Sequence, residues 1–127
     1  MSARPGDGEH GTGAPKAAVR PTPAEREDAA RELARIRDEI DVLDRRIVEL
    51  LNARAGLGRE AGRAKRLAGR RAVHDPERER EVLLRVAMEN AGPMSQADLL
   101  SIYRRIVAAT RTLEARDRTH EGRNGDG

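Results

Sequence analysis

Cysteine, tryptophan and phenylalanine are absent from this chain, and Tyr103 is its one aromatic residue. The absence of cysteine excludes disulfides, thiolate metal ligands and cysteine nucleophiles. The three histidines are scattered and lack the spacing of a structural zinc site, so we expect no metal. The core must be built from Leu, Ile, Val, Ala and Met, which favours packed helices over a sheet.

Long apolar runs are also missing. No segment approaches the ~20 residues that span a bilayer, and the N-terminus has no apolar signal region. We therefore expect a cytoplasmic protein with no membrane partner. The 25 basic and 22 acidic residues are interspersed, so the net charge of +3 is only a weak indication of nucleic-acid binding, and we expect none.

Both ends of the chain lack the periodicity of folded elements. Residues 1–21 and 117–127 are rich in glycine and charged residues, and the N-terminal segment is also rich in proline. Such segments cannot bury enough apolar surface to offset the entropy of ordering, so we expect both to be disordered. Residues 22–116 carry three helical patterns and no strand pattern, which predicts one all-α domain.

The longest helical pattern begins at Thr22-Pro23-Ala24-Glu25, where Thr suits the N-cap, Pro the first helical position and Glu the third. It continues to about residue 67, and its apolar residues are spaced as in a coiled-coil seam. Roughly 45 residues at 1.5 Å each give a length of about 65 Å, against a radius of gyration of about 13 Å for a compact domain. The rest of the chain cannot cover such a helix, so we expect a second copy to lie along it. The seam contains Leu33, Ile36, Ile40, Leu43, Ile47, Leu50, Leu57 and Ala61.

Two shorter helices follow. Asp75 and Pro76 predict the start of the second, which Asn90-Ala91-Gly92-Pro93 ends. Ser95, with Asp98 three positions on, predicts the start of the third. Their inward stripes contain Val82, Leu83, Val86 and Ala87 in the second helix, and Leu99, Ile102, Tyr103, Ile106, Val107, Thr110 and Leu113 in the third.

Polar residues interrupt these apolar faces. Arg54 and Lys65 lie on the seam of the first helix, about 20° apart around its axis and roughly 16 Å apart along it. The inward stripes of the other two helices also contain polar residues near one end, Glu79 in the second helix and Thr110 and Glu114 in the third. A pocket with three cations and little else polar suits a small polyanion, most simply a dicarboxylate. If the three ends converge, the pocket is lined by Arg54, Lys65, Arg78, Glu79, Thr110 and Glu114.

Each of these residues also has an ordinary structural explanation. Arg54 and Lys65 could extend their charged ends into solvent, and Arg78 and Glu79 could belong to a solvated first turn. Three coordinated interruptions favour a common ligand, because an isolated buried charge is costly. Arg37 lies about 100° away from the Arg54 line around the helix, so it suits the equivalent pocket of an antiparallel partner.

Several motifs occur in a recognisable order: Leu33-x-x-Ile36-Arg37-x-x-Ile40-Asp41-x-x-Asp44, Leu50-Leu51-x-x-Arg54, Gly62-x-x-Lys65 and Asp75-Pro76-x-Arg78-Glu79. Over about residues 31–116 this set resembles the all-helical class of chorismate mutases. The resemblance implies an intertwined homodimer of three-helix chains with paired first helices. It also implies a pericyclic rearrangement of chorismate to prephenate, in aromatic amino-acid biosynthesis, without cofactor, metal or nucleophile.

The resemblance assigns roles to three basic residues. Arg37 looks like the arginine that reaches across the dimer to a substrate carboxylate. Arg54 resembles the main carboxylate-binding arginine of the same chain. Lys65 resembles the lysine that contacts a carboxylate and the ether oxygen of the breaking C–O bond.

Five further positions also match the family. Arg78 is similar to its supporting arginine, and Asp75 and Glu79 to the pair around the ring hydroxyl. Thr110 falls where the family often has Ser. Glu114 falls where bacterial members often have Gln, which donates a hydrogen bond to the ether oxygen. An ionised carboxylate would repel the charge that develops there, so we expect Glu114 to act in its protonated form.

Alternatives remain open. An isochorismate-pyruvate lyase shares the fold, although the D-P-x-R-E motif favours the mutase. A mutase of secondary metabolism would act on 4-amino-4-deoxychorismate. A nucleic-acid or protein-binding helical module would need Arg54 and Lys65 to be exposed. Some short members of the family gain activity from a partner enzyme of the shikimate pathway. Three glycines, Gly56, Gly58 and Gly62, indicate either close helix approach or room for substrate.

Overall fold

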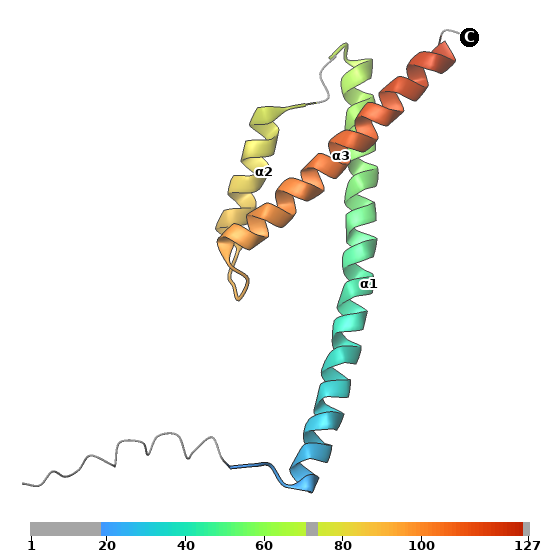
Figure 1. The fold of residues 1–127 in the computed structure, drawn as a ribbon. Helices are drawn as coiled ribbons and strands as arrows, with labels where there is room; N and C mark the ends of the chain where they lie inside the picture. The colour runs from blue at the N-terminus through green and yellow to red at the C-terminus, as the bar shows by residue number, and fades with distance from the viewer. Residues whose placement is uncertain (1–18, 71–73, 126–127) are drawn as a thin grey trace, which may run out of the picture. The chain divides into compact units, whose positions relative to one another are not determined.

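A computed structural model describes residues 19–70 and 74–125 of the chain. It contains three helices, α1 (Pro23–Leu67), α2 (Pro76–Glu89) and α3 (Gln96–Gly125) (Figure 1). No strand occurs within these residues, so the predicted all-α class with a very long first helix is confirmed. The predicted disorder of residues 1–18 and 126–127 concerns segments outside the described residues.

The chain divides within α1 into two compact units, residues 1–44 and 45–127. In the first unit, the predicted capping box begins α1. Thr22 Oγ1 accepts a hydrogen bond from Glu25 N at 3.1 Å, and Glu25 Oε2 accepts one from Thr22 N at 3.1 Å. The pair satisfies donors that the first helical turn leaves free. The seam residues of this unit stay between 39% and 58% exposed: Leu33, Ile36, Ile40 and Leu43.

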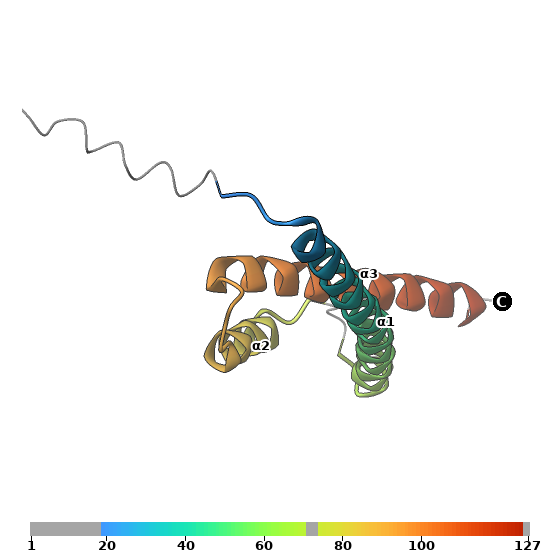
Figure 2. The same ribbon diagram turned by 90° about the horizontal axis from the view of Figure 1, so that it is seen from below.

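The second unit contains the end of α1 together with α2 and α3. Asp75 Oδ1 accepts from Arg78 N at 3.2 Å, and Ser95 Oγ accepts from Asp98 N at 3.1 Å, as expected for the two predicted N-caps. Figures 1 and 2 show α3 beside α2 and crossing the end of α1. Helix α3 therefore contacts both α2 and the end of α1, where Thr110 and Glu114 lie against Gly58 and Gly62.

Glycine permits the crossing of α1 and α3. A Cβ atom at Gly58 would collide with the methyl group of Thr110, and one at Gly62 would lie 3.0 Å from Cγ of Glu114. A Cβ at Gly56 would meet nothing within 4 Å. Close helix approach therefore accounts for Gly58 and Gly62, whereas it does not account for Gly56.

Helix α3 continues through residues 117–125, for which we expected disorder from their composition. Arg59 donates to both carboxylate oxygens of Asp117 at 2.7 and 2.9 Å, and Arg66 donates to both of Glu121 at 2.7 Å. These hydrogen bonds hold the pKa values of Asp117 and Glu121 below their usual range. These charged pairs connect the extension to α1. We refer to residues 117–125 as the α3 extension.

Few residues are buried in the described part of the chain. Only Gly62, Val107 and Glu114 are buried there. Several apolar residues of α1 in the second unit remain more than half exposed: Ile47, Leu50 and Leu57. None of the described helices is long and apolar enough to cross a membrane.

Candidate functional site

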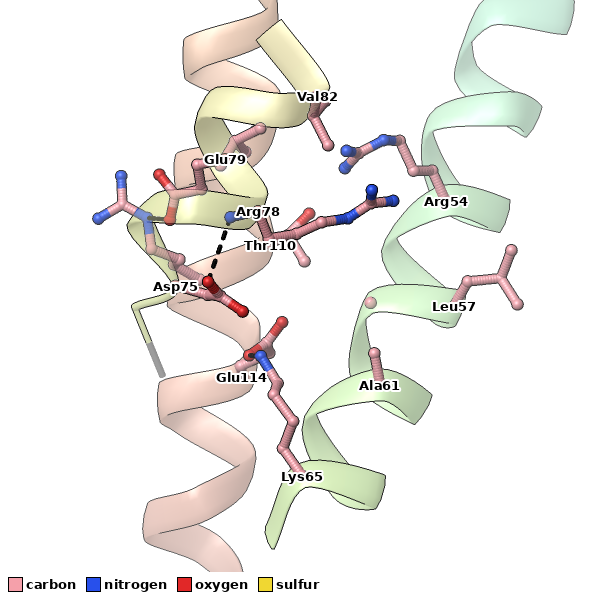
Figure 3. A pocket seen from close by; sticks show the side chains of 13 residues that line it. Arg54, Leu57, Ala61, Lys65, Asp75, Arg78, Glu79, Val82, Thr110 and Glu114 are labelled. Atoms are coloured by element: carbon pink, nitrogen blue, oxygen red, sulfur yellow. Dashed lines mark hydrogen bonds and ion pairs between the residues drawn. The ribbon is translucent and has the colours of Figure 1, made fainter. Parts of the chain in front are cut away.

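A cavity of about 390 Å³ lies between the end of α1, α2 and α3, within the second unit (Figure 3). All the same-chain site residues predicted from the sequence lie in its wall. Three carboxylates and four basic side chains line it, together with small and apolar residues from all three helices. The lining residues are Arg54, Leu57, Gly58, Ala61, Lys65, Asp75, Arg78, Glu79, Val82, Val107, Thr110, Arg111 and Glu114.

The α1 wall carries the two seam cations. Figure 3 shows Arg54 and Lys65 extending from α1 toward the other two helices, with Ala61 between them. The Arg54 guanidinium carbon lies 6.0 Å from the centre of the Tyr103 ring, at the outer limit of a cation–π contact. Both cations thus face the cavity from one helix, at the two ends of the α1 wall.

Lys65 and Glu114 form the most buried charged pair of the site. Lys65 Nζ donates to Glu114 Oε2 at 3.1 Å, and the two side chains are 19% and 9% exposed. Pairing offsets the cost of burying either charge alone. The two residues stand 49 positions apart in the chain, so the crossing of α1 and α3 is what brings them together.

The α2 wall begins with a cap. Asp75 accepts from Arg78 N, and its other carboxylate oxygen lies 3.8 Å from Arg70 Nη2. Arg78 lines the cavity and extends toward α1, while its Nη1 donates to Glu81 Oε1 at 2.8 Å. The guanidinium is shared between the cavity and its own helix, which suits a supporting cation.

The α3 wall contains Arg111, which was not among the predicted site residues. Arg111 Nε lies 3.1 Å from Glu79 Oε2, and His74 Nε2 lies 3.4 Å from the same oxygen. Arg111 follows the buried Val107 by four positions, in the same way that Thr110 follows Ile106. Applying the same i to i+4 spacing to Val107 would have identified Arg111 as a candidate site residue.

Two of the predicted site residues, Thr110 and Arg37, do not present a free polar group to the cavity of their own chain. Thr110 Oγ1 donates to Ile106 O at 3.2 Å within its own helix, so its hydroxyl proton is already used. Arg37 is exposed on α1 and is not part of the cavity wall. The prediction that it serves the pocket of a second copy stays a prediction.

The arrangement suits an anionic organic ligand better than a metal ion. Among residues 19–70 and 74–125, no group of three or more His, Asp or Glu side chains is placed to hold a metal. The cavity instead offers cations that can form charge-assisted hydrogen bonds with carboxylates. Its volume is within the range of small-molecule sites, which begins near 300 Å³.

Comparison with known proteins gives consistent matches. Residues 36–115 match the family described as chorismate mutase type II. Over 87 residues the chain is 40% identical to a bifunctional chorismate mutase/prephenate dehydratase of Aquifex aeolicus, covering 65% of this chain and 24% of the relative. A protein of the same name from Stutzerimonas stutzeri is 33% identical over 89 residues, covering 67% of this chain and 24% of the relative.

A solved structure agrees in fold over about two thirds of this chain. The chorismate mutase (form II) of Thermus thermophilus superposes with a TM-score of 0.64 and 33% sequence identity, covering 67% of this chain and 96% of that structure. The two curated relatives are much longer, and the chain spans 24% of the length of each.

Proposed function

The chain belongs to the chorismate mutase type II family, and we propose that it converts chorismate to prephenate in the cavity between α1, α2 and α3. The observation that carries the proposal is the convergence of Arg54, Lys65 and Glu114 on one cavity of suitable size. The reaction is a pericyclic rearrangement within one molecule, a step of aromatic amino-acid biosynthesis.

The cations of the cavity bind the carboxylates of the substrate. Chorismate carries two carboxylates, and its reactive conformer is compact. Arg54 and Lys65 face the cavity from the two ends of the α1 wall, so each can hold one end of the substrate. Holding both carboxylates selects the compact conformer and removes much of the entropic barrier before bonds change.

The catalytic step needs donors at the ether oxygen, where negative charge grows as the C–O bond breaks. Lys65 and a protonated Glu114 can both donate there, and their burial strengthens the interaction. An ionised Glu114 would bind Lys65 and repel the developing charge. We therefore assign catalysis to the pair with Glu114 in its neutral form.

A second copy of the chain completes the proposed enzyme. The described part of one copy buries only three residues, while the apolar seam of α1 stays exposed. A domain with so small a core is poorly stabilised alone, so a homodimer along α1 accounts for the exposed seam. Arg37 would then enter the site of the opposite copy.

Burial of the site weighs against the nucleic-acid alternative. A phosphate-binding module needs its cations exposed to the backbone of the nucleic acid. The Lys65 side chain is only 19% exposed and is paired with Glu114. This favours a small ligand inside the cavity.

A direct assay tests the proposal. Purified protein is mixed with chorismate, and its loss and the appearance of prephenate are followed by NMR. We expect turnover by the wild type, a loss of at least about 100-fold in kcat/KM for Arg54→Ala from the missing carboxylate contact, and no change for Arg105→Ala, an exposed arginine of α3. A wild type that leaves chorismate unchanged would refute the proposal.

A further inference from the structure

The surroundings of Glu79 are not explained by carboxylate binding. Glu79 lines the cavity from α2, and Figure 3 shows it on the wall opposite Arg54. Its side chain is 20% exposed and lies close to two groups from outside the α2 helix. These are Arg111 of α3 at 3.1 Å and His74 at 3.4 Å, both measured to Oε2.

Arg111 acts on Glu79 through charge. Its Nε is buried and makes no hydrogen bond with any described residue, although it lies within ion-pairing distance of Glu79. A guanidinium is charged at every physiological pH. Arg111 therefore places a permanent positive charge beside the Glu79 carboxylate.

The charge of the two walls orients the ligand. The carboxylates of the proposed substrate belong beside Arg54 and Lys65 on α1, because Glu79 repels them from the opposite wall. The substituent that faces Glu79 must then be a hydrogen-bond donor. In chorismate this donor is the neutral ring hydroxyl, whereas 4-amino-4-deoxychorismate carries a protonated amine at that position.

We propose that Arg111 is a positioning residue that neutralises the Glu79 carboxylate and so makes the site select a neutral hydroxyl over an ammonium group on the substrate ring. This inference rests on the proposed function and adds the substrate preference of the same site. A lone carboxylate in a partly closed cavity attracts an ammonium group strongly. With Arg111 paired to it, the carboxylate is occupied by a cation and its attraction for an ammonium group is weakened.

Competition between the two substrates tests the inference. Chorismate and 4-amino-4-deoxychorismate are mixed in one reaction, and the ratio of their kcat/KM values is measured. We expect Arg111→Met to shift the ratio toward the amino substrate by about fivefold, the size of a partly exposed ion pair. Arg111→Lys keeps the charge and retains the wild-type preference, and Arg105→Met is the matched control on the same helix.

A double variant separates charge from packing. In a Glu79→Gln background the carboxylate is gone, so Arg111→Met no longer shifts the ratio. A ratio unchanged in Arg111→Met, or shifted equally with and without Glu79, overturns the inference while the mutase activity stands. A wild type that converts neither substrate overturns the proposed function, and the inference falls with it.

Discussion

In the proposed mechanism, the charge of Glu114 decides whether the site can assist the reaction. It is buried, accepts a hydrogen bond from Lys65 and lies beside Gly62 at the helix crossing. An ionised Glu114 engages the ammonium group that the ether oxygen needs, and it also repels the charge growing on that oxygen. The neutral acid avoids both effects, so the proposed mechanism requires the Lys65–Glu114 pair to take up a proton before the reaction.

A Glu114→Gln substitution should flatten the pH profile. Gln keeps the shape and the donor of the protonated acid but does not titrate. The wild-type kcat should be higher in acid than in alkaline solution, while the kcat of the Gln variant stays level. Chorismate turnover measured from acid to alkaline pH checks this. A wild-type rate that is equally level would show that Glu114 does not act as an acid.

Comparing Lys65→Met with a double variant should separate the effect of Lys65 on stability from its effect on activity. Removing the lysine leaves the buried Glu114 without its partner, which costs about 3 kcal/mol of unfolding free energy. The double variant Lys65→Met, Glu114→Leu removes both charges, so it should regain most of that stability and stay inactive. Urea unfolding and the chorismate assay give the two readouts. A double variant as unstable as the single one would mean that packing, not charge, is lost.

At the scale of elements, the sequence predicted the helix caps but not the contacts between residues far apart in the chain. The caps at Thr22, Asp75 and Ser95 were readable because their partners lie three positions away. The α3 extension was not, because its partners Arg59 and Arg66 lie 58 and 55 positions earlier. Helical spacing could have placed Arg111 on the inner face of α3, but it could not have placed Arg111 beside Glu79, which lies on another helix.

The helix crossing predicts opposite effects for two glycines of α1. Gly58→Ala places a Cβ against Thr110, so it should force α1 and α3 apart and destabilise the protein. Gly56→Ala meets open space and should add about 0.5–1 kcal/mol through helix propensity. Thermal unfolding of the two variants compares them directly. Equal effects in the same direction would contradict a close contact at Gly58.

The α3 extension should loosen in acid. The lowered pKa values of Asp117 and Glu121 mean that their pairs with Arg59 and Arg66 stabilise the fold above the ordinary carboxyl pKa of about 4. This stabilisation is lost as the pH falls through the lowered folded-state values. Asp117→Asn should reduce stability at neutral pH and weaken the further loss in acid.

Urea midpoints at neutral and acid pH measure the effect. Glu27→Gln, at an exposed acid of α1, is the matched control and should leave the pH dependence unchanged. If Asp117→Asn behaves like this control, the charged pairs do not hold the α3 extension.

At the scale of the whole molecule, the exposed seam of α1 is the main feature. The spacing of the apolar residues predicted the seam, because periodicity shows which face of a helix is apolar. It also predicted that the seam is longer than the rest of one chain can cover. It could not say which copy supplies which residue to the site, because that depends on the pairing geometry. The proposed dimer should appear as a single species of twice the chain mass in sedimentation. A monomer at assay concentration would contradict it.

Mixing two inactive variants tests the central claim, a chorismate mutase site shared between two copies. Arg37→Ala and Arg54→Ala should each abolish most activity alone. In a mixed dimer one site regains both arginines, so unfolding and refolding the two variants together should restore roughly a quarter of the wild-type rate per chain. No recovery in a sample shown to contain mixed dimers would contradict the account.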